Sequence, residues 1–107
     1  MSELNANDGS FITLSEGAEY TARYRDLAPV PEEMIKALFV GKNKIKALLD
    51  QEGVVGIRIY YGINEDGVQN LVLVGALPNG DDVTDLIVEK LRPCPPNCGS
   101  ANDLNGN

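Results

Sequence analysis

The sequence predicts an α+β fold in which an antiparallel sheet, built on a central hairpin, carries two or three helices on one face. Three observations support this prediction. A run of β-branched and aromatic residues at 54–61 is followed, after turn residues, by a second apolar run at 71–77. Two segments that precede this hairpin, 13–27 and 42–51, have the caps or the apolar spacing of helices.

The first expected helix begins with a capping box. Thr13 is the N-cap and Glu16, at the third helical position, reaches back to it. Ser15 is an alternative cap. The helix should continue to about Leu27, because prolines follow within 28–33 and proline cannot continue a helix.

Two readings are open for the segment that follows. Pro31-Glu32-Glu33 has the proline and the acids of a helix first turn. Met34–Val40 is almost uniformly apolar, so it is either a second helix ended by Gly41 or a turn that leads into a short strand. The next helix, 42–51, is better defined because Ile45, Leu48 and Leu49 have the i, i+3, i+4 spacing.

The central hairpin has Asn64–Gly67 as its turn, since Asn and Asp bond to nearby backbone and Gly accepts positive φ. A loop of about four residues would pair Ile63 with Val68 and Ile59 with Val72. One face of the hairpin is then the core, and the other is covered by a partner or partly wet. The predicted core face holds Ile57, Ile59, Val72 and Val74, and the other face Arg58, Tyr60, Leu71 and Leu73.

The remaining chain is less determined. Residues 78–82 form a turn, and 83–91 fits a helix or a third strand equally well. We expect a single α+β domain over 11–98, a disordered N-terminal tail at 1–10 and a flexible C-terminal tail at 99–107.

Composition excludes several function classes. The 107 residues include 16 acids and 9 bases, a net charge of −7, which argues against nucleic-acid binding and against anionic membrane surfaces. No apolar run approaches the ~20 residues that span a bilayer. The chain has no histidine, which removes Ser-His and Cys-His nucleophile systems and His-ligated metals within one chain. The N-terminus has no export signal, so we expect a cytoplasmic protein. We also expect no cofactor.

Cys94-Pro95-Pro96-Asn97-Cys98 is the most unusual segment, and four readings are open for it. The cysteines could form a local disulfide, which a reducing cytosol disfavours. They could act in thiol redox chemistry, although the spacing is not C-x-x-C. They could bind a metal if a dimer pooled four thiolates. Finally, they could be buried structural thiols, the reading to which we give most weight.

Arginines and tyrosines offer a candidate ligand site. Arg25, on the first helix, could pair with a carboxylate or extend past small alanines to water. Alternatively Arg25, with Arg58 and the hydroxyl of Tyr60, could line a pocket for an anion. The acidic clusters Glu65-Asp66 and Asp81–Asp85 lack the spacing of a calcium loop, and we assign them turn and cap roles.

The chain resembles a group of small uncharacterised bacterial proteins. The resemblance rests on Gly56-Ile57-Arg58-Ile59-Tyr60-Tyr61-Gly62, the preceding 48–53, the run Thr21–Arg25 and Cys94-Pro95-Pro96-Asn97-Cys98. It covers most of 11–98 and implies a single domain, but no activity is attached to it.

Together these observations predict a small binding or protein-interaction module rather than an enzyme. A homo-oligomer is one expected partner state, and an unknown protein or small ligand is another. The alternative is a thiol-dependent protein that acts through Cys94 and Cys98, in redox chemistry or metal binding.

Overall fold

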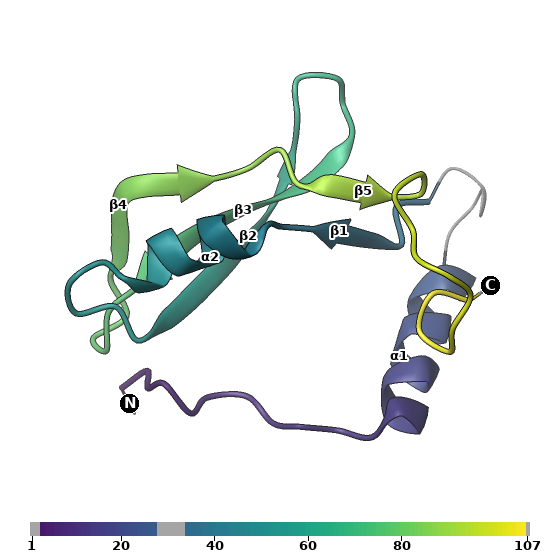
Figure 1. Ribbon diagram of the computed structural model, residues 1–107, viewed down its shortest axis with the longest axis horizontal. Coiled ribbons are helices and arrows are strands. Elements are labelled where there is room, and N and C mark those ends of the chain that lie inside the picture. The colour runs from purple at the N-terminus through teal and green to yellow at the C-terminus, as the bar shows by residue number, and fades with distance from the viewer. Residues whose placement is uncertain (1–2, 28–33, 107) are drawn as a thin grey trace. The chain divides into compact units, whose positions relative to one another are not determined.

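A computed structural model describes residues 3–27 and 34–106 of the chain (Figure 1). These residues form two helices and two antiparallel sheets, so the predicted α+β class is confirmed. Contacts divide the chain into two compact units, one of residues 1–9 and 40–91 and one of residues 10–39 and 92–107. Each unit is described by itself. The single domain and the two tails expected from the sequence stay a prediction.

The first unit contains a three-stranded sheet of β2 (Gly56–Ile63), β3 (Gln69–Ala76) and β4 (Asp82–Val88). The strand order is β2-β3-β4 and both pairings are antiparallel, so β3 is the central strand. Its second half supplies most of the buried side chains of this unit: Leu73, Val74 and Ala76.

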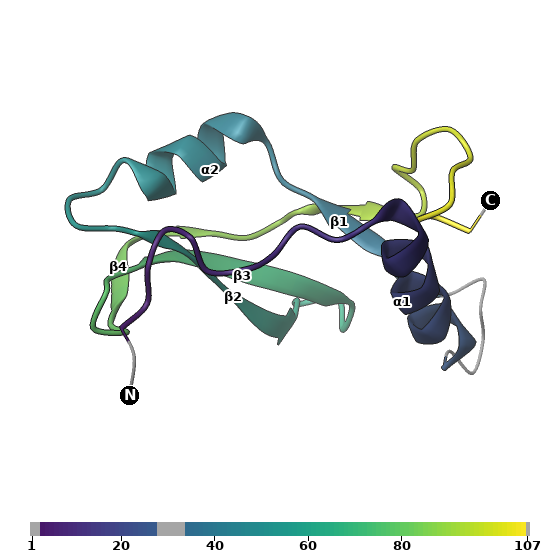
Figure 2. The ribbon, with the colours of Figure 1, turned by 90° about the horizontal axis from the view of Figure 1, so that it is seen from below.

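Helix α2 (Lys42–Leu49) packs on this sheet, as Figure 2 shows, and it confirms the helix predicted at 42–51. Leu48 is fully buried at the contact. The backbone of β3 comes close at Gly75, where an added Cβ would lie 2.8 Å from the Val54 side chain and 3.2 Å from the Leu48 carbonyl oxygen. Only glycine fits this position, because backbone and a β-branched side chain would both have to move.

The predicted register of the hairpin is wrong by one residue. Ile59 pairs with Leu73 and not with Val72, while Arg58 pairs with Val74. Because paired residues share a face, Arg58 and Tyr60 lie on the face of Val72 and Val74. Leu71 and Leu73 accordingly share the α2 side of the sheet with Ile57 and Ile59.

The turn explains this shift. The N–H of Asn64 donates to the Val68 carbonyl at 2.9 Å, which leaves three residues in the loop, Glu65–Gly67, in place of the expected four. Gly67 has φ +77°, the left-handed conformation of a three-residue hairpin loop closed by a bulge. The Asn64 side chain also accepts the N–H groups of Asp66 and Val68.

Residues 82–88 form a strand, so of the two structures predicted for 83–91 the third strand is correct and the helix is wrong. The pairing is interrupted: Gly75 pairs with Val83, but Leu73 pairs with Val88. Residues 84–87 are therefore an insertion opposite Val74, and β4 bends sharply there (Figure 1).

The second unit contains α1 (Leu14–Asp26), which begins at the predicted capping box. The N–H of Glu16 donates to Thr13 Oγ1, and the N–H of Thr13 donates to Glu16 Oε1, each at 3.1 Å. Arg23 and Glu19 form an i,i+4 ion pair at 2.6 Å on the exposed side.

A second sheet, which the sequence did not predict, pairs β1 (Ala37–Phe39) with β5 (Arg92–Cys94) in the same unit. The open question over 34–40 is answered by this short strand, and a helix over those residues is wrong. The expected helix turn at Pro31–Glu33 lies outside the described residues. In the described part of the chain, no helix has the length and apolar character to cross a membrane.

Candidate functional site

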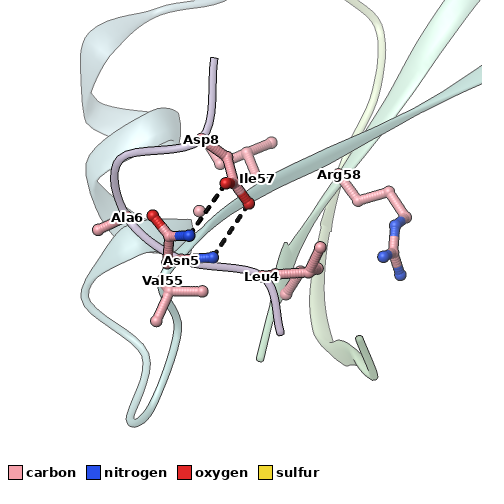
Figure 3. Close-up of a pocket in the computed structure, with 9 residues that line it drawn as sticks. Leu4, Asn5, Ala6, Asp8, Val55, Ile57 and Arg58 are labelled. Atoms are coloured by element: carbon pink, nitrogen blue, oxygen red, sulfur yellow. Dashed lines mark hydrogen bonds between the residues drawn. The ribbon is translucent and has the colours of Figure 1, made fainter. Parts of the chain in front are cut away.

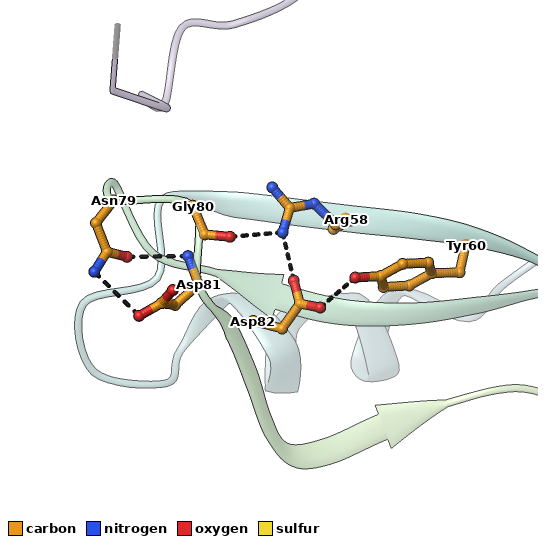
Figure 4. A network of polar contacts seen from close by, with 6 residues as sticks. All are labelled: Arg58, Tyr60, Asn79, Gly80, Asp81 and Asp82. Atoms are coloured by element: carbon orange, nitrogen blue, oxygen red, sulfur yellow. Dashed lines mark hydrogen bonds and ion pairs between the residues drawn. The ribbon is translucent and has the colours of Figure 1, made fainter. Parts of the chain in front are cut away.

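Arg58, Tyr60 and Asp82 form a connected polar network on one face of the three-stranded sheet (Figure 4). Arg58 Nη1 donates to Asp82 Oδ1 at 2.6 Å and to the Gly80 carbonyl at 2.7 Å. The Tyr60 hydroxyl donates to Asp82 Oδ2. Since the register aligns Asp82 with Ala76 in the central strand, its side chain lies on the face that carries Arg58 and Tyr60.

The turn between β3 and β4 completes this network. Asn79 Oδ1 accepts the N–H of Asp81 at 3.0 Å, and Asn79 Nδ2 donates to Asp81 Oδ2 at 3.1 Å. Gly80 lies between them with φ +97°, a backbone conformation that residues other than glycine rarely adopt. This conformation accompanies the contact of the Gly80 carbonyl with the guanidinium of Arg58.

The network shifts the protonation of its members. The hydrogen bond from Tyr60, followed by the hydrogen bond and charge of Arg58, lowers the pKa of Asp82 despite its partial burial. The hydrogen bond to Asp82 raises the pKa of Tyr60 and also that of Arg58. At neutral pH the network therefore holds one carboxylate, one guanidinium and one neutral phenol, with no net charge.

These contacts connect β2 to β4 and to the turn before it, and they leave no uncompensated charge in the network for a ligand to bind. The Asp82 carboxylate neutralises the Arg58 guanidinium, and the Tyr60 proton is engaged with the same carboxylate. The prediction of an anion site at Arg58 and Tyr60 thus loses its charge basis. Arg58 and Tyr60 were predicted from the sequence as site residues, whereas Asp82 was predicted only as a turn residue.

A cavity of about 370 Å³ lies beside Arg58, between the N-terminal segment and the start of β2 (Figure 3). The N-terminal segment is held by Leu4, whose N–H donates to the Pro78 carbonyl at 2.8 Å. The carboxylate of Asp8 lies in this cavity and accepts from the backbone and side chain of Asn5, each at 3.0 Å. A carboxylate in the same cavity further disfavours an anionic ligand near Arg58.

Arg25, the third residue of the predicted ligand site, belongs to the other unit. Its Nη1 donates to the Leu104 carbonyl at 2.8 Å. An added Cβ at Gly106 would lie 2.6 Å from the guanidinium, so the chain passes directly against Arg25 there. Arg25 therefore anchors the C-terminal segment of its unit.

Cys94 and Cys98 are joined by a disulfide, with Cα atoms 4.7 Å apart. The reading as buried structural thiols is wrong, because neither sulfur is reduced. Asn97 holds the loop: its backbone N–H and its Nδ2 donate to the Pro93 carbonyl at 2.9 and 3.1 Å. Within 3–27 and 34–106, no group of three or more His, Cys, Asp or Glu side chains is placed to hold a metal ion.

A further surface feature, the β2 stripe, consists of Ile59, Tyr61 and Ile63. These side chains share one face, the α2 side that also carries Leu71 and Leu73, and they alternate along the strand with Tyr60 and Gly62 on the other face. They are 53%, 86% and 71% exposed. The uncovered apolar surface was predicted at Tyr60, Leu71 and Leu73 instead, because the predicted register was shifted by one residue.

Comparisons with protein-family models, with curated proteins and with solved structures find no match for the chain. The resemblance to bacterial proteins that carry the Gly56–Gly62 strand and the Cys94–Cys98 motif stays a prediction.

Proposed function

We propose that the protein is a small, non-enzymatic interaction module that binds a second copy of itself along the outer edge of β2. The observation that carries this proposal is the β2 stripe, whose three large apolar side chains are more than half exposed. Contiguous exposed apolar surface is typical of protein–protein contact sites.

The backbone of β2 is also suited to pairing with a second chain at this surface. On the side away from β3, no strand pairs with β2 among the described residues. Hydrogen-bonded and non-bonded pairs alternate in an antiparallel ladder, and Asn64 bonds to Val68. The alternation directs the N–H and C=O groups of Ile59, Tyr61 and Ile63 outward. The residues with exposed side chains thus also offer the unpaired backbone groups.

β2 lacks several of the features that usually prevent pairing at a sheet edge. Exposed edge strands are commonly short or carry lysine, proline or a bulge. β2 has eight residues, with neither lysine nor proline among them. Its one charged side chain, Arg58, is neutralised by Asp82 on the opposite face from the stripe.

A two-fold axis at Tyr61 gives a self-complementary arrangement. Two antiparallel β2 strands would pair Tyr61 with its own copy and Ile59 with Ile63 of the other chain. Aromatic and β-branched cross-strand pairs of this kind stabilise a ladder by roughly 0.2–1 kcal/mol each.

Light scattering after size-exclusion chromatography tests this proposal. We expect a mass near twice the chain mass of 11.5 kDa that decreases on dilution. Tyr61→Lys should give the single-chain mass, because two lysines would face each other across the axis. Tyr20→Lys, the same change at a half-exposed tyrosine of α1, is the matched control and should remain dimeric. A single-chain mass for the wild type at every concentration would refute the proposal.

A second candidate function is favoured by the disulfide. We expect a cytoplasmic protein, and a reducing cytosol does not maintain permanent disulfides. In that compartment a cellular dithiol would reduce the Cys94–Cys98 bond: it gives two electrons and two protons, both cysteines become thiols, and the dithiol becomes a disulfide. Thiol–disulfide exchange with an oxidised cellular dithiol reverses the step, taking back the two electrons and two protons.

Alkylation of the protein inside intact cells tests this second candidate. Rapid acid quenching followed by a thiol-specific label counts reduced cysteines by mass. A changing fraction of labelled Cys94 and Cys98 under oxidant supports redox cycling. A bond that stays fully oxidised in the cell supports a structural disulfide and an oxidising compartment.

A further inference from the structure

The second unit presents a groove beside the disulfide. The β1–β5 ladder pairs Phe39 with Arg92 and Ala37 with Cys94. Because alternate residues of a strand share a face, an exposed aromatic ring, an exposed guanidinium and the disulfide lie on the same side of this two-stranded sheet.

The groove encloses about 400 Å³, a volume within the range of small-molecule sites. Its apolar lining comes from β1, the disulfide and Leu104. The C-terminal wall is held in place: Asn102 Oδ1 accepts the N–H groups of Leu104 and Asn105 at 2.8 and 3.0 Å, and Lys36 Nζ donates to the Asn105 carbonyl at 2.8 Å. The described residues thus form a pocket with ordered walls.

The charge of the lining is opposite to that of the chain. The protein carries −7 overall, yet the described residues that line the groove include the cations Arg92 and Lys36 and no carboxylate. Arg92 donates from Nη2 to the amide oxygen of Asn97 at 3.1 Å, and no ion pair to Arg92 occurs in the part of the chain that the structure describes. Its other N–H groups remain able to form the planar, two-point contact that a carboxylate accepts.

We propose that this groove binds a small organic anion, with its carboxylate on Arg92 and an apolar ring against Phe39 and the disulfide. The ring buries apolar surface on a half-exposed phenylalanine, and the guanidinium fixes the orientation of the anion. The groove residues belong to the other unit than β2. The proposed anion binding therefore does not depend on the proposed self-association.

The test uses 2-naphthoate and its neutral counterpart 2-naphthamide, which share an apolar body and differ in the charge. Each is titrated into ¹⁵N-labelled protein, and amide shifts are followed by NMR. We expect 2-naphthoate to cause saturable shifts confined to β1 and to residues 92–105. The amide should bind about tenfold more weakly, since the ion pair between the carboxylate and the Arg92 guanidinium is replaced by a hydrogen bond to a neutral carbonyl oxygen.

Two variants of matched chemistry locate the charge. Arg92→Gln should weaken 2-naphthoate about tenfold and leave 2-naphthamide unchanged. Arg23→Gln removes the same charge from an exposed arginine of α1 that does not line the groove, and it should leave both affinities within about twofold. Phe39→Ala should weaken both ligands, because the apolar contact is common to them.

Three results would overturn the proposal. One is the absence of saturable shifts in β1 and 92–105. Another is equal affinity for the acid and the amide in the wild-type protein, a comparison that needs no variant to fold. The third is an equal effect of Arg92→Gln and Arg23→Gln, which would reduce the contribution of Arg92 to general electrostatics.

Discussion

Asp82 is the residue that connects the polar network of the first unit, because it accepts from both Arg58 and Tyr60. Its side chain is three-quarters buried, with 23% exposed, so its two partners act in a partly desolvated setting. Replacing it would leave the guanidinium without its ionic partner and the phenol without its acceptor.

The acid stability of the protein should therefore depend on Asp82. Its pKa is lower in the folded chain than the unfolded value of about 3.9, so its contribution is full above that value and is lost as the pH falls through the folded pKa. We expect the melting temperature of the wild type to fall below about pH 4. Asp82→Asn should be less stable at neutral pH and show a flatter profile, measured by thermal unfolding across pH.

Asp85→Asn is the control, since Asp85 is an exposed residue of the same strand. It should keep the acid-dependent fall of the wild type. If Asp82→Asn and Asp85→Asn gave the same profile, the network would contribute nothing to the pH dependence.

Gly80 provides a second test at the level of one residue. Its φ of +97° disfavours any side chain, although an added Cβ would meet no atom within 4 Å. Gly80→Ala should therefore cost roughly 1–2 kcal/mol in the free energy of unfolding, through the backbone alone. Gly99→Ala, also in open space but without positive φ, should be neutral or slightly stabilising in denaturant unfolding.

Sequence reasoning recovered only part of this site. Arg58 and Tyr60 could be selected because they interrupt an apolar strand with polar groups. Asp82 could not, because its partners depend on which residues of three strands are aligned. That alignment in turn depends on Gly67, whose positive φ shortens the hairpin loop by one residue.

Among the elements, the loop closed by Cys94 and Cys98 allows a direct test of its contribution to stability. Cys94 and Cys98 are four residues apart, and closing so short a loop contributes about 2 kcal/mol in the chain-entropy model. Reduction, or the pair Cys94→Ser and Cys98→Ser, should lower the free energy of unfolding by about that amount in urea titrations. An unchanged midpoint after complete reduction, verified by intact mass, would show that the bond does not stabilise the fold.

The elements that were predicted correctly have local causes. α1 begins where Thr13 and Glu16 cap each other, and α2 follows the spacing of Ile45, Leu48 and Leu49. The apolar run at 34–40 gives no such local cue, and β1 forms there because β5 supplies its partner from more than fifty residues away. Pairing over that distance is not visible in periodicity.

At the scale of the whole molecule, the proposed assembly follows from one edge of one sheet. Ile59, Tyr61 and Ile63 combine exposed apolar side chains with outward backbone groups. The sequence analysis expected dimerisation but placed it on a different set of side chains. Leu73, which was expected to be uncovered, is buried, and the exposed apolar side chains of the stripe are Ile59, Tyr61 and Ile63. Dimerisation itself stays a prediction.

Amide hydrogen exchange of β2 as a function of protein concentration tests this claim most directly. We predict that the amides of Ile59, Tyr61 and Ile63 exchange slowly in concentrated solution and rapidly on dilution, because they point away from β3 and would be bonded by the second chain. The amides of Tyr60 and Gly62, which point toward β3, should stay slow at both concentrations. Rapid exchange of Ile59, Tyr61 and Ile63 at every concentration would contradict the proposed pairing.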